Sequence, residues 1–111
     1  MSFPQGEILL VTMLFTDGRA AKKRPVMVVF DGGDDDLLVA PVTSRSPRSL
    51  RDVALAQWQK AGLRLASIVR LEKLATVEKS TVIRRLGRIE PGDWASVKLV
   101  LNRFFADILT Q

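Results

Sequence analysis

The fold is decided by KKRPVMVVF at Lys22–Phe30 and by the apolar run LLVAPV at residues 37–42. The second half of the first stretch is apolar at every position, which is typical of a strand that is buried on both faces. Arg24 stands beside the start of the first apolar run, and Thr43 follows the end of the second. A guanidinium and a hydroxyl presented at strand ends suit the recognition of a phosphate group.

Short apolar runs separated by turn residues predict further strands along the chain. Pro25 can open its strand because the first backbone donor is dispensable there. Gly62 is expected to end a helical turn at residues 58–63. We expect strands at residues 7–14, 26–30, 37–42, 52–57, 66–71 and 86–89, a loop at 15–23 with a turn at Asp17-Gly18, a hairpin turn at 31–36, and a short helix or turn at 78–85.

The last segment carries the clearest helical pattern. Pro91 suits a first helical position, and Asp93 lies in the first turn, where negative charge is favourable. One apolar stripe repeats at helical spacing, and apolar residues outside it indicate a second burial partner. Strands followed by one helix predict a mainly β fold with α, a small curved barrel with a C-terminal helix packed against it. The stripe comprises Trp94, Val97, Leu101, Phe104 and Ile108, and the residues outside it are Leu99, Val100, Phe105 and Leu109.

Length and charge limit the function classes. The 111 residues fit one domain, 1–111, and hydrophobic residues make up 47%, enough for a core,. There are 17 Lys and Arg against 12 Asp and Glu, a formal net charge of +5, which favours nucleic acid or an acidic protein as the partner. The chain has no Cys and no His, so disulfides, thiolate nucleophiles and the usual zinc ligands are excluded.

No metal, cofactor or membrane is expected as a partner. The acidic residues at 31–36 surround Gly32-Gly33 without the spacing of a calcium loop, so a solvated hairpin tip is the expected structure,. No apolar run reaches the roughly 18 residues of a membrane span, and residues 1–7 lack the basic region of a signal peptide. We therefore expect a cytoplasmic protein.

Blocks of residues along nearly the whole chain resemble the MazF/PemK family of toxin endoribonucleases from bacterial toxin–antitoxin systems. The order and spacing of the blocks carry the resemblance, rather than any single block. It implies an SH3-like barrel, a homodimer, cleavage of single-stranded RNA without metal, and a cognate antitoxin protein as partner. The blocks read GEILLV at 6–11, FTDG at 15–18, KRPVMVV at 23–29, VAPVTS at 39–44, SIVRLEKLATV at 67–77 and RLGRI at 85–89.

The same resemblance implies four catalytic residues. The family's functional Arg directly precedes the Pro of the second strand, which is Arg24 here, and its functional Thr closes the third strand, which is Thr43. In the plasmid-borne branch an Arg and an Asp two residues apart also serve the site; Arg70 matches this Arg, and Glu72 stands where the Asp would be. On a strand, Arg70 and Glu72 would face the same way. The first loop lacks the Glu or His that many members carry, so the identity of the general base stays open.

Each catalytic candidate also has an ordinary structural interpretation. Arg24 would stabilise charge on a phosphorane or on the leaving oxygen, or simply be a basic residue at a strand start. Thr43 would donate to a phosphate oxygen, or only be a β-branched strand residue. Glu72 would accept the 2′-hydroxyl proton while Arg70 holds the phosphate, or the two would form a surface ion pair.

Basic and polar residues near these candidates would form a track for single-stranded RNA. The sequence thus predicts a toxin endoribonuclease that cleaves single-stranded RNA sequence-selectively by 2′-hydroxyl attack. Two alternatives remain open. One is a CcdB-like gyrase poison on the same fold, ranked lower because residues 108–111 lack the terminal Trp of that group; the other is a catalytically inactive RNA-binding barrel. The expected RNA-binding residues are Lys22, Lys23, Ser44, Arg45, Arg48 and Arg51.

Overall fold

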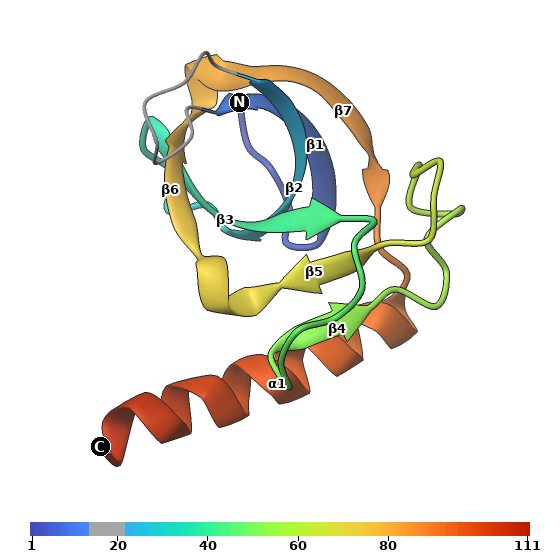
Figure 1. Cartoon of the computed structure of the whole chain (residues 1–111). Coiled ribbons are helices and arrows are strands. Elements are labelled where there is room, and N and C mark those ends of the chain that lie inside the picture. The colour runs from blue at the N-terminus through green and yellow to red at the C-terminus, as the bar shows by residue number, and fades with distance from the viewer. Residues whose placement is uncertain (14–21) are drawn as a thin grey trace.

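A strand-rich body followed by one long helix makes up the described part of the chain (Figure 1). The computed structural model describes residues 1–13 and 22–111. Within these ranges the strands are β1 (Glu7–Met13), β2 (Lys22–Phe30), β3 (Asp36–Thr43), β4 (Asp52–Ala54), β5 (Ile68–Arg70), β6 (Ala75–Glu78) and β7 (Val82–Arg88), accompanied by two 3-10 helices, η1 (Leu71–Lys73) and η2 (Lys79–Thr81), and by the α-helix α1 (Pro91–Leu109).

The described strands form one antiparallel sheet in the order β4-β5-β3-β2-β1-β7, with β6 paired to β3 beside this path. The central strand β2 pairs with β1 through Val26↔Leu9 and with β3 through Val26↔Pro41. The strands curve into a ring (Figure 1), but the described strands do not close it by pairing. A mainly β fold with a C-terminal helix is thereby confirmed, and an SH3-like barrel describes it loosely.

The curvature divides the buried apolar residues into two clusters. One cluster contains Leu9 and Val26 and includes Phe3 from the segment before β1. The other contains Ile8 and Val97 and joins the sheet to α1. Ile8 and Leu9 enter different clusters because successive side chains of a strand point to opposite faces. A strand between two clusters must be apolar at every position, which explains the unbroken apolar run of β2.

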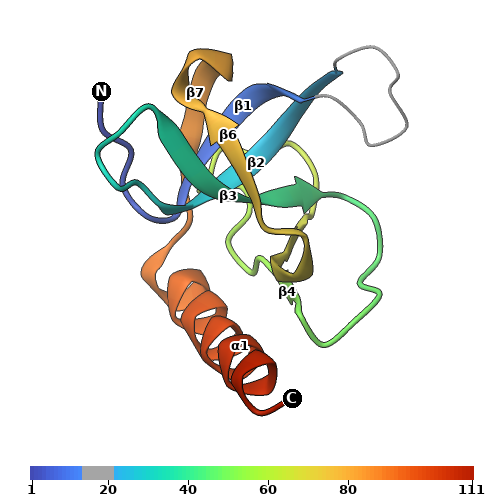
Figure 2. The same ribbon diagram turned by 90° about the vertical axis from the view of Figure 1, so that its left-hand side faces the viewer.

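Helix α1 lies beneath the sheet (Figure 2), with its first half next to β4 (Figure 1). Its start at Pro91 confirms the predicted beginning. Asp93 is buried, and its two carboxylate oxygens accept the N–H groups of Ala56 and Gln57, both at 2.9 Å. Within the predicted stripe, Val97 is fully buried, whereas Ile108 is 50% exposed. No helix in residues 1–13 and 22–111 is long and apolar enough to cross a membrane.

Two Lys residues that were expected in the first loop belong to β2. Lys22 and Lys23 pair with Met13 and Thr12 of β1. Backbone pairing carries the strand beyond its apolar run, and a hydropathy pattern does not record such pairing. The predicted turn at Asp17-Gly18, and the rest of that loop up to residue 21, lie outside the described residues.

The second half of the sheet departs most from the predicted bounds. The strand expected at 52–57 ends at Ala54, since residues 56–62 form turns, and the one expected at 66–71 is confined to Ile68–Arg70, since η1 begins at Leu71. The segment 78–85, expected as a helix or turn, contains η2 and then most of β7, which begins at Val82 and so exceeds the strand expected at 86–89. β6 has no counterpart among the predicted strands, since four residues are too few to show a period.

The acidic hairpin is only partly solvated, which corrects the expectation for residues 31–36. The Asp31 carboxylate accepts the N–H groups of Phe3 and Gly33, each at 2.9 Å, and lies 2.9 Å from the Lys79 Nζ. Hydrogen bonds from Gly33, Lys79 and Phe3, in that order of influence, lower the pKa of Asp31 from 3.8 to about 2. Asp34 and Asp35 are exposed, as expected. Asp31 therefore fastens the amino-terminal segment to the β2–β3 hairpin and η2.

We expect Asp31→Asn to lower the melting temperature at neutral pH and to lose this effect in acid. Because the folded-state pKa lies below 3.8, the ionised carboxylate stabilises the fold fully above about pH 4 and progressively less as the pH falls toward about 2. Thermal unfolding of both proteins across this range measures the effect. The two melting temperatures should converge in acid, and a difference that stays constant down to about pH 2 would contradict the assignment.

Candidate active site

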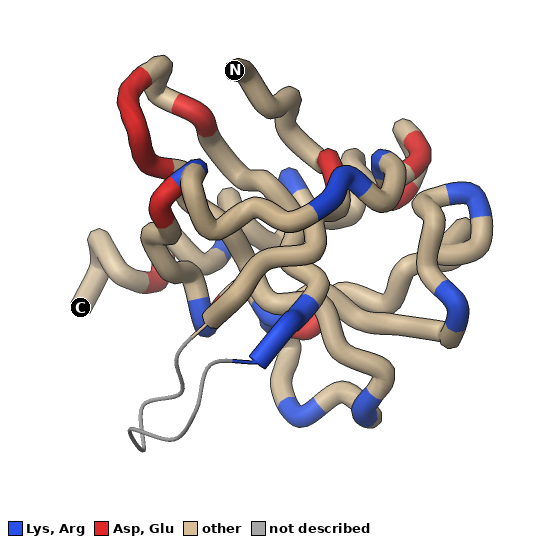
Figure 3. Tube along the Cα trace, turned by 90° about the horizontal axis from the view of Figure 1, so that it is seen from above, with Lys and Arg blue, Asp and Glu red and all other residues tan. Residues whose placement is uncertain are grey.

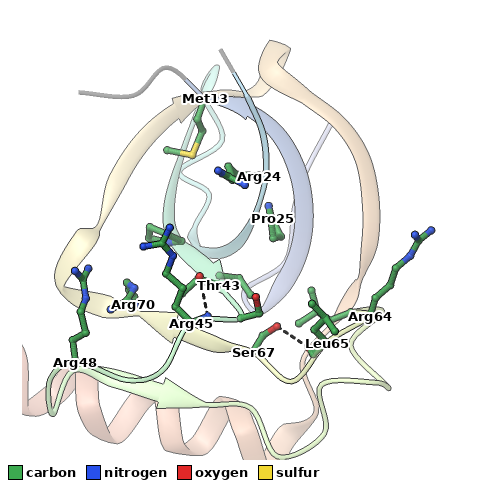
Figure 4. Close-up of a pocket in the computed structure, with 14 residues that line it drawn as sticks. Met13, Arg24, Pro25, Thr43, Arg45, Arg48, Arg64, Leu65, Ser67 and Arg70 are labelled. Carbon is green, nitrogen blue, oxygen red and sulfur yellow. Dashed lines mark hydrogen bonds between the residues drawn. The ribbon is translucent and has the colours of Figure 1, made fainter. Parts of the chain in front are cut away.

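A cavity of about 630 Å³ opens where β2, β3 and β5 meet the loops that follow β3 and precede β5. Figure 4 shows side chains from these segments arranged around the opening. Apolar side chains, among them Met13 and Leu65, share its lining with polar groups, and the described lining residues include no Asp or Glu. Five of the described lining residues are arginines: Arg24, Arg45, Arg48, Arg64 and Arg70.

Strand register explains why residues distant in sequence meet here. β2 and β3 are antiparallel, and their last pair on this side is Val26↔Pro41. Continuing this register by two residues brings Arg24 opposite Thr43. β3 also pairs with β5, through Thr43↔Ile68, so Arg70 at the end of β5 lies two residues along from the partner of Thr43. The sequence candidates Arg24, Thr43 and Arg70 therefore line one cavity.

The Thr43 hydroxyl takes part in a local turn. Its Oγ1 accepts the N–H of Arg45 at 3.2 Å (Figure 4), and the residue is half-buried. A hydroxyl that accepts one hydrogen bond still carries its own proton, so it can donate that proton to a further oxygen. Thr43 thus closes the turn after β3 and can also act as a neutral donor toward the cavity.

Arg70 is held by a carboxylate that the sequence analysis missed. Its Nη1 lies 2.9 Å from the Asp52 Oδ2, and the two side chains are 9% and 3% exposed. The same Oδ2 accepts the N–H of Arg48 at 2.7 Å. Asp52 and Arg70 are directly opposed in the β4–β5 pairing, which places their side chains on one face of the sheet. Arg70 is therefore fixed by its partner across the sheet.

The expectation that Arg70 and Glu72 share the face of one strand is wrong. β5 ends at Arg70, and Glu72 lies in η1, where the chain turns away. The Glu72 carboxylate instead lies 2.8 Å from Arg51 Nη1 and is 40% exposed. Glu72 lines a smaller cavity of about 300 Å³ beside the main one. The alternation rule fails because it holds only for extended backbone.

Arg51 takes part in a separate group of contacts at the helix. Its Nη2 lies 3.2 Å from the Asp107 Oδ2, and its guanidinium carbon lies 5.0 Å from the centre of the Phe104 ring. Together with the ion pair to Glu72, these contacts connect η1 to the second half of α1. Arg51 does not line the main cavity, in contrast to its neighbours Arg45 and Arg48.

Charges of opposite sign occupy different parts of the surface. Figure 3 shows acidic positions gathered chiefly in the loop at the upper left, whereas loops at the bottom and right carry mainly Lys and Arg. No group of three or more acidic side chains suited to a metal ion is present in the described ranges. The cavity is therefore suited to an anionic ligand.

The comparison with family models supplies the deciding observation. The model of the family described as "PemK-like, MazF-like toxin of type II toxin-antitoxin system" matches residues 4–105. The chain belongs to this family. The resemblance inferred from the sequence blocks is thereby confirmed. Comparison with curated protein sequences gave no significant match.

Solved structures share the fold at low sequence identity. Mycobacterium tuberculosis toxin MazF-mt6 is similar with a TM-score of 0.74 and 18% identity, over 90% of this chain and 96% of that one. An endoribonuclease in complex with its cognate antitoxin, from a mycobacterial species, has a TM-score of 0.77 and 14% identity, over 95% of this chain and 96% of that one. MazE-MazF from Deinococcus radiodurans has a TM-score of 0.74 and 17% identity, over 92% of this chain and 94% of that one. At these identities the likeness establishes the fold alone.

Family membership leaves the roles of individual residues to be judged from their positions. Among the predicted RNA-binding residues, Ser44, Arg45 and Arg48 line the cavity, while Lys22 and Lys23 lie on β2 just before Arg24. Sequence reasoning missed Asp52 and Arg64. Asp52 had one usable signal, since it opens the predicted strand at 52–57, which could pair with the strand containing Arg70. Arg64 had none, because it lies in an irregular segment between Gly62 and β5.

Proposed function

We propose that the chain is a toxin endoribonuclease that cleaves single-stranded RNA, such as mRNA, sequence-selectively. The observation that carries this proposal is the cavity that Arg24, Thr43 and Arg70 line together. Its described lining residues include no Asp or Glu. Such a cavity favours a phosphodiester, because guanidinium groups match pairs of phosphate oxygens. Membership in the PemK-like and MazF-like family supports it, and so do fold relatives described as endoribonucleases.

In the proposed reaction, the 2′-oxygen of one nucleotide attacks the adjacent phosphorus, and the bond from phosphorus to the 5′-oxygen of the next nucleotide breaks. The attacking hydroxyl loses its proton, and the departing oxygen gains one, which leaves a 2′,3′-cyclic phosphate and a 5′-hydroxyl. Negative charge grows on the non-bridging oxygens during the attack. Arg24 and Arg70 would stabilise this charge, and Thr43 would donate one further hydrogen bond.

The proposed catalysis depends on positioning and charge stabilisation more than on a strong base. A guanidinium remains protonated and cannot accept the 2′ proton. The hypothesis that Glu72 accepts it loses its geometric support, since Arg51 binds this carboxylate outside the main cavity. We propose that the reaction needs no metal ion, because the arginine side chains supply the positive charge. Ser44, Arg45 and Arg48, with Lys22 and Lys23, would bind the flanking RNA.

We expect Thr43→Ala to slow cleavage about tenfold and Thr43→Ser to stay close to the wild type. Loss of one neutral hydrogen bond costs about 0.5–1.5 kcal/mol, and the upper end of this range corresponds to roughly a tenfold change in rate. Ser keeps both the hydroxyl proton and the acceptor for the Arg45 N–H. Single-turnover cleavage of one RNA oligonucleotide by the three proteins measures this. Equal rates for Ala and Ser variants would remove the hydroxyl from the mechanism.

Incubation of the purified protein with defined single-stranded RNA in EDTA, followed by mapping of the ends, tests the proposed function. Cuts at a recurrent sequence with 2′,3′-cyclic phosphate and 5′-hydroxyl ends are expected. Binding without cuts would indicate an inactive RNA-binding barrel. Inhibition of DNA gyrase with no effect on RNA would indicate the gyrase poison, and cuts only after addition of Mg²⁺ would overturn metal independence.

We further propose that an acidic antitoxin neutralises the toxin by occupying its basic cavity. The arginines among the described lining residues would also attract a carboxylate-rich peptide,. Two of the fold relatives are described as complexes, one with a cognate antitoxin and one as MazE-MazF. An antitoxin bound there would compete with RNA for the same side chains.

We expect the toxin to be a homodimer that uses the exposed apolar face of α1. Leu99 is 59% exposed and Leu109 is 83% exposed in the single chain, and two-fold pairing is the commonest way to bury such a face. Sedimentation equilibrium should give about twice the 12.3 kDa of one chain. Leu99→Glu should shift the mass toward a monomer, whereas Ile83→Glu, an equally apolar exposed position on β7, should not. A wild-type monomer at micromolar concentration would contradict this.

A further inference from the structure

We infer that Asp52 is a positioning residue of the site: it holds Arg70 and the backbone of Arg48 in the wall of the main cavity, so that both face the scissile phosphate in a fixed arrangement. This inference rests on the proposed RNA cleavage and adds to it a residue of the active-site wall. Asp52 does not line the main cavity, so it would act through its neighbours and not on the RNA.

The burial of the ion pair is the first support for this inference. The Asp52 side chain is 3% exposed and that of Arg70 is 9% exposed, with 2.9 Å between Oδ2 and Nη1. A carboxylate at this depth is costly unless it is paired and hydrogen-bonded. Exposed pairs such as Arg51 with Glu72, at 32% and 40% exposure, lack this constraint. The buried pair therefore has one well-defined geometry.

One carboxylate oxygen organises two separate segments. Asp52 Oδ2 accepts from Arg70 Nη1 of β5 and, at 2.7 Å, from the backbone N–H of Arg48 in the loop after β3. The loop is thus attached to β4 at the point where β4 pairs with β5 through Asp52↔Arg70. Without Asp52, neither the guanidinium nor this part of the loop keeps the same anchor.

Within the described residues, Asp52 and Ser46 leave other N–H donors of Arg70 available to a ligand. A guanidinium has five N–H donors in a planar fork. Asp52 takes one of them, and the Ser46 carbonyl accepts a second at 3.5 Å, a long contact. Because Arg70 lines the main cavity, its other donors can meet phosphate oxygens there. The ordering of this side chain is accomplished during folding, which lowers the cost of orienting it when RNA binds.

The residues that line the two cavities show which part of the site Asp52 supports. Arg48 and Arg70 line both the cavity of about 630 Å³ and the one of about 300 Å³ beside it. Asp52 lines only the smaller of the two. It therefore lies behind the wall that Arg48 and Arg70 form, on the side away from the main opening. Asp52 is therefore placed to support this wall from behind.

A double-mutant cycle on single-turnover cleavage tests the inference. The proteins are the wild type, Asp52→Asn, Arg70→Gln and the double variant. Asp52→Asn should slow cleavage about 10- to 100-fold, the scale expected when a reacting group is displaced by about 1 Å. In the Arg70→Gln background the same change should have a much smaller effect, since Asp52 would then act only through the Arg48 N–H,. Additive losses would overturn the inference.

Asp31→Asn is the matched control, because Asp31 also combines backbone N–H bonds with a close Lys79 ion pair but lines neither cavity. It should lower the melting temperature at neutral pH and leave the cleavage rate unchanged. If Asp52→Asn does not fold, Asp52→Glu retains the charge and moves the carboxylate by one methylene. A folded Asp52→Glu variant should lose more in cleavage rate than in RNA affinity; a wild-type rate would overturn the positioning role.

A second measurement separates this inference from the proposed function. The same cycle is measured as the Kd of a 2′-deoxy oligonucleotide, which binds but cannot undergo 2′ attack. If the wild type does not cleave RNA, the proposed function fails. The inference then survives only if the losses in binding caused by Asp52→Asn and Arg70→Gln are non-additive. Additive or absent losses in binding would overturn it in that case as well.

Discussion

Arg24→Ala is expected to slow single-turnover RNA cleavage by at least about 100-fold while the protein remains folded. The loss of one preorganised donor to a developing oxyanion costs about that much in other enzymes. Arg24 is exposed at the start of β2 and lines the main cavity, so the change should affect the fold far less than the reaction. Because the continued β2–β3 register brings Arg24 opposite Thr43, we expect both donors to act on the same side of a bound phosphate.

Arg24→Lys should not restore the full rate, because an ammonium cannot contact two phosphate oxygens in the planar fork geometry of a guanidinium. Arg84→Ala serves as the control, since Arg84 is also an exposed strand arginine, on β7, and lies outside the cavity. Melting temperatures recorded in parallel separate loss of fold from loss of reaction. A cleavage rate near that of the wild type for Arg24→Ala would remove the proposed site.

The largest loss of stability is expected from Gly62→Ala. Gly62 has a φ of +87°, which disfavours any L side chain,. A Cβ at this position would also overlap the backbone carbonyl of Leu86 on β7, which cannot rotate away as a flexible side chain would. We expect the free energy of unfolding to fall by about 3 kcal/mol or more, from backbone strain and overlap together.

Gly33→Ala is the control that tests the strain of a positive φ alone, without overlap of the new Cβ. Its φ of +89° is almost the same, but a Cβ there would meet nothing within 4 Å. It should therefore cost only about 1–2 kcal/mol. Urea denaturation of the two variants and the wild type gives the difference. Equal losses at Gly62 and Gly33 would show that the close approach of the 56–62 turn to β7 contributes nothing.

The sequence allowed the prediction of what depends on local pattern. The end of β3 at Thr43 follows from an unbroken apolar run, and the start of α1 follows from Pro91. The order of the blocks allowed the family to be recognised without any single specific motif. The strand end and the helix start could be predicted because each is determined by residues within a few positions of one another.

What was missed depends on pairing between distant segments. Asp52 and Arg70 are separated by 18 positions and meet only because β4 pairs with β5. Glu72 was expected beside Arg70 because side chains two positions apart on a strand face the same way, but η1 begins at Leu71 and Glu72 pairs with Arg51,. The prediction that the whole hairpin 31–36 is solvated failed for the same reason, since Lys79 and Phe3 approach Asp31 from elsewhere in the chain.

The separation of charge over the surface has a consequence for the first encounter with a polyanion. Asp34 and Asp35 are exposed at the β2–β3 hairpin, whereas the described residues that line the main cavity include five arginines and no acidic residue. A molecule with this distribution has an electric dipole moment as well as a net charge. The field of an RNA strand would exert a torque that turns the cavity toward it before any contact forms. The hairpin would thus contribute to the orientation of collisions without touching the RNA.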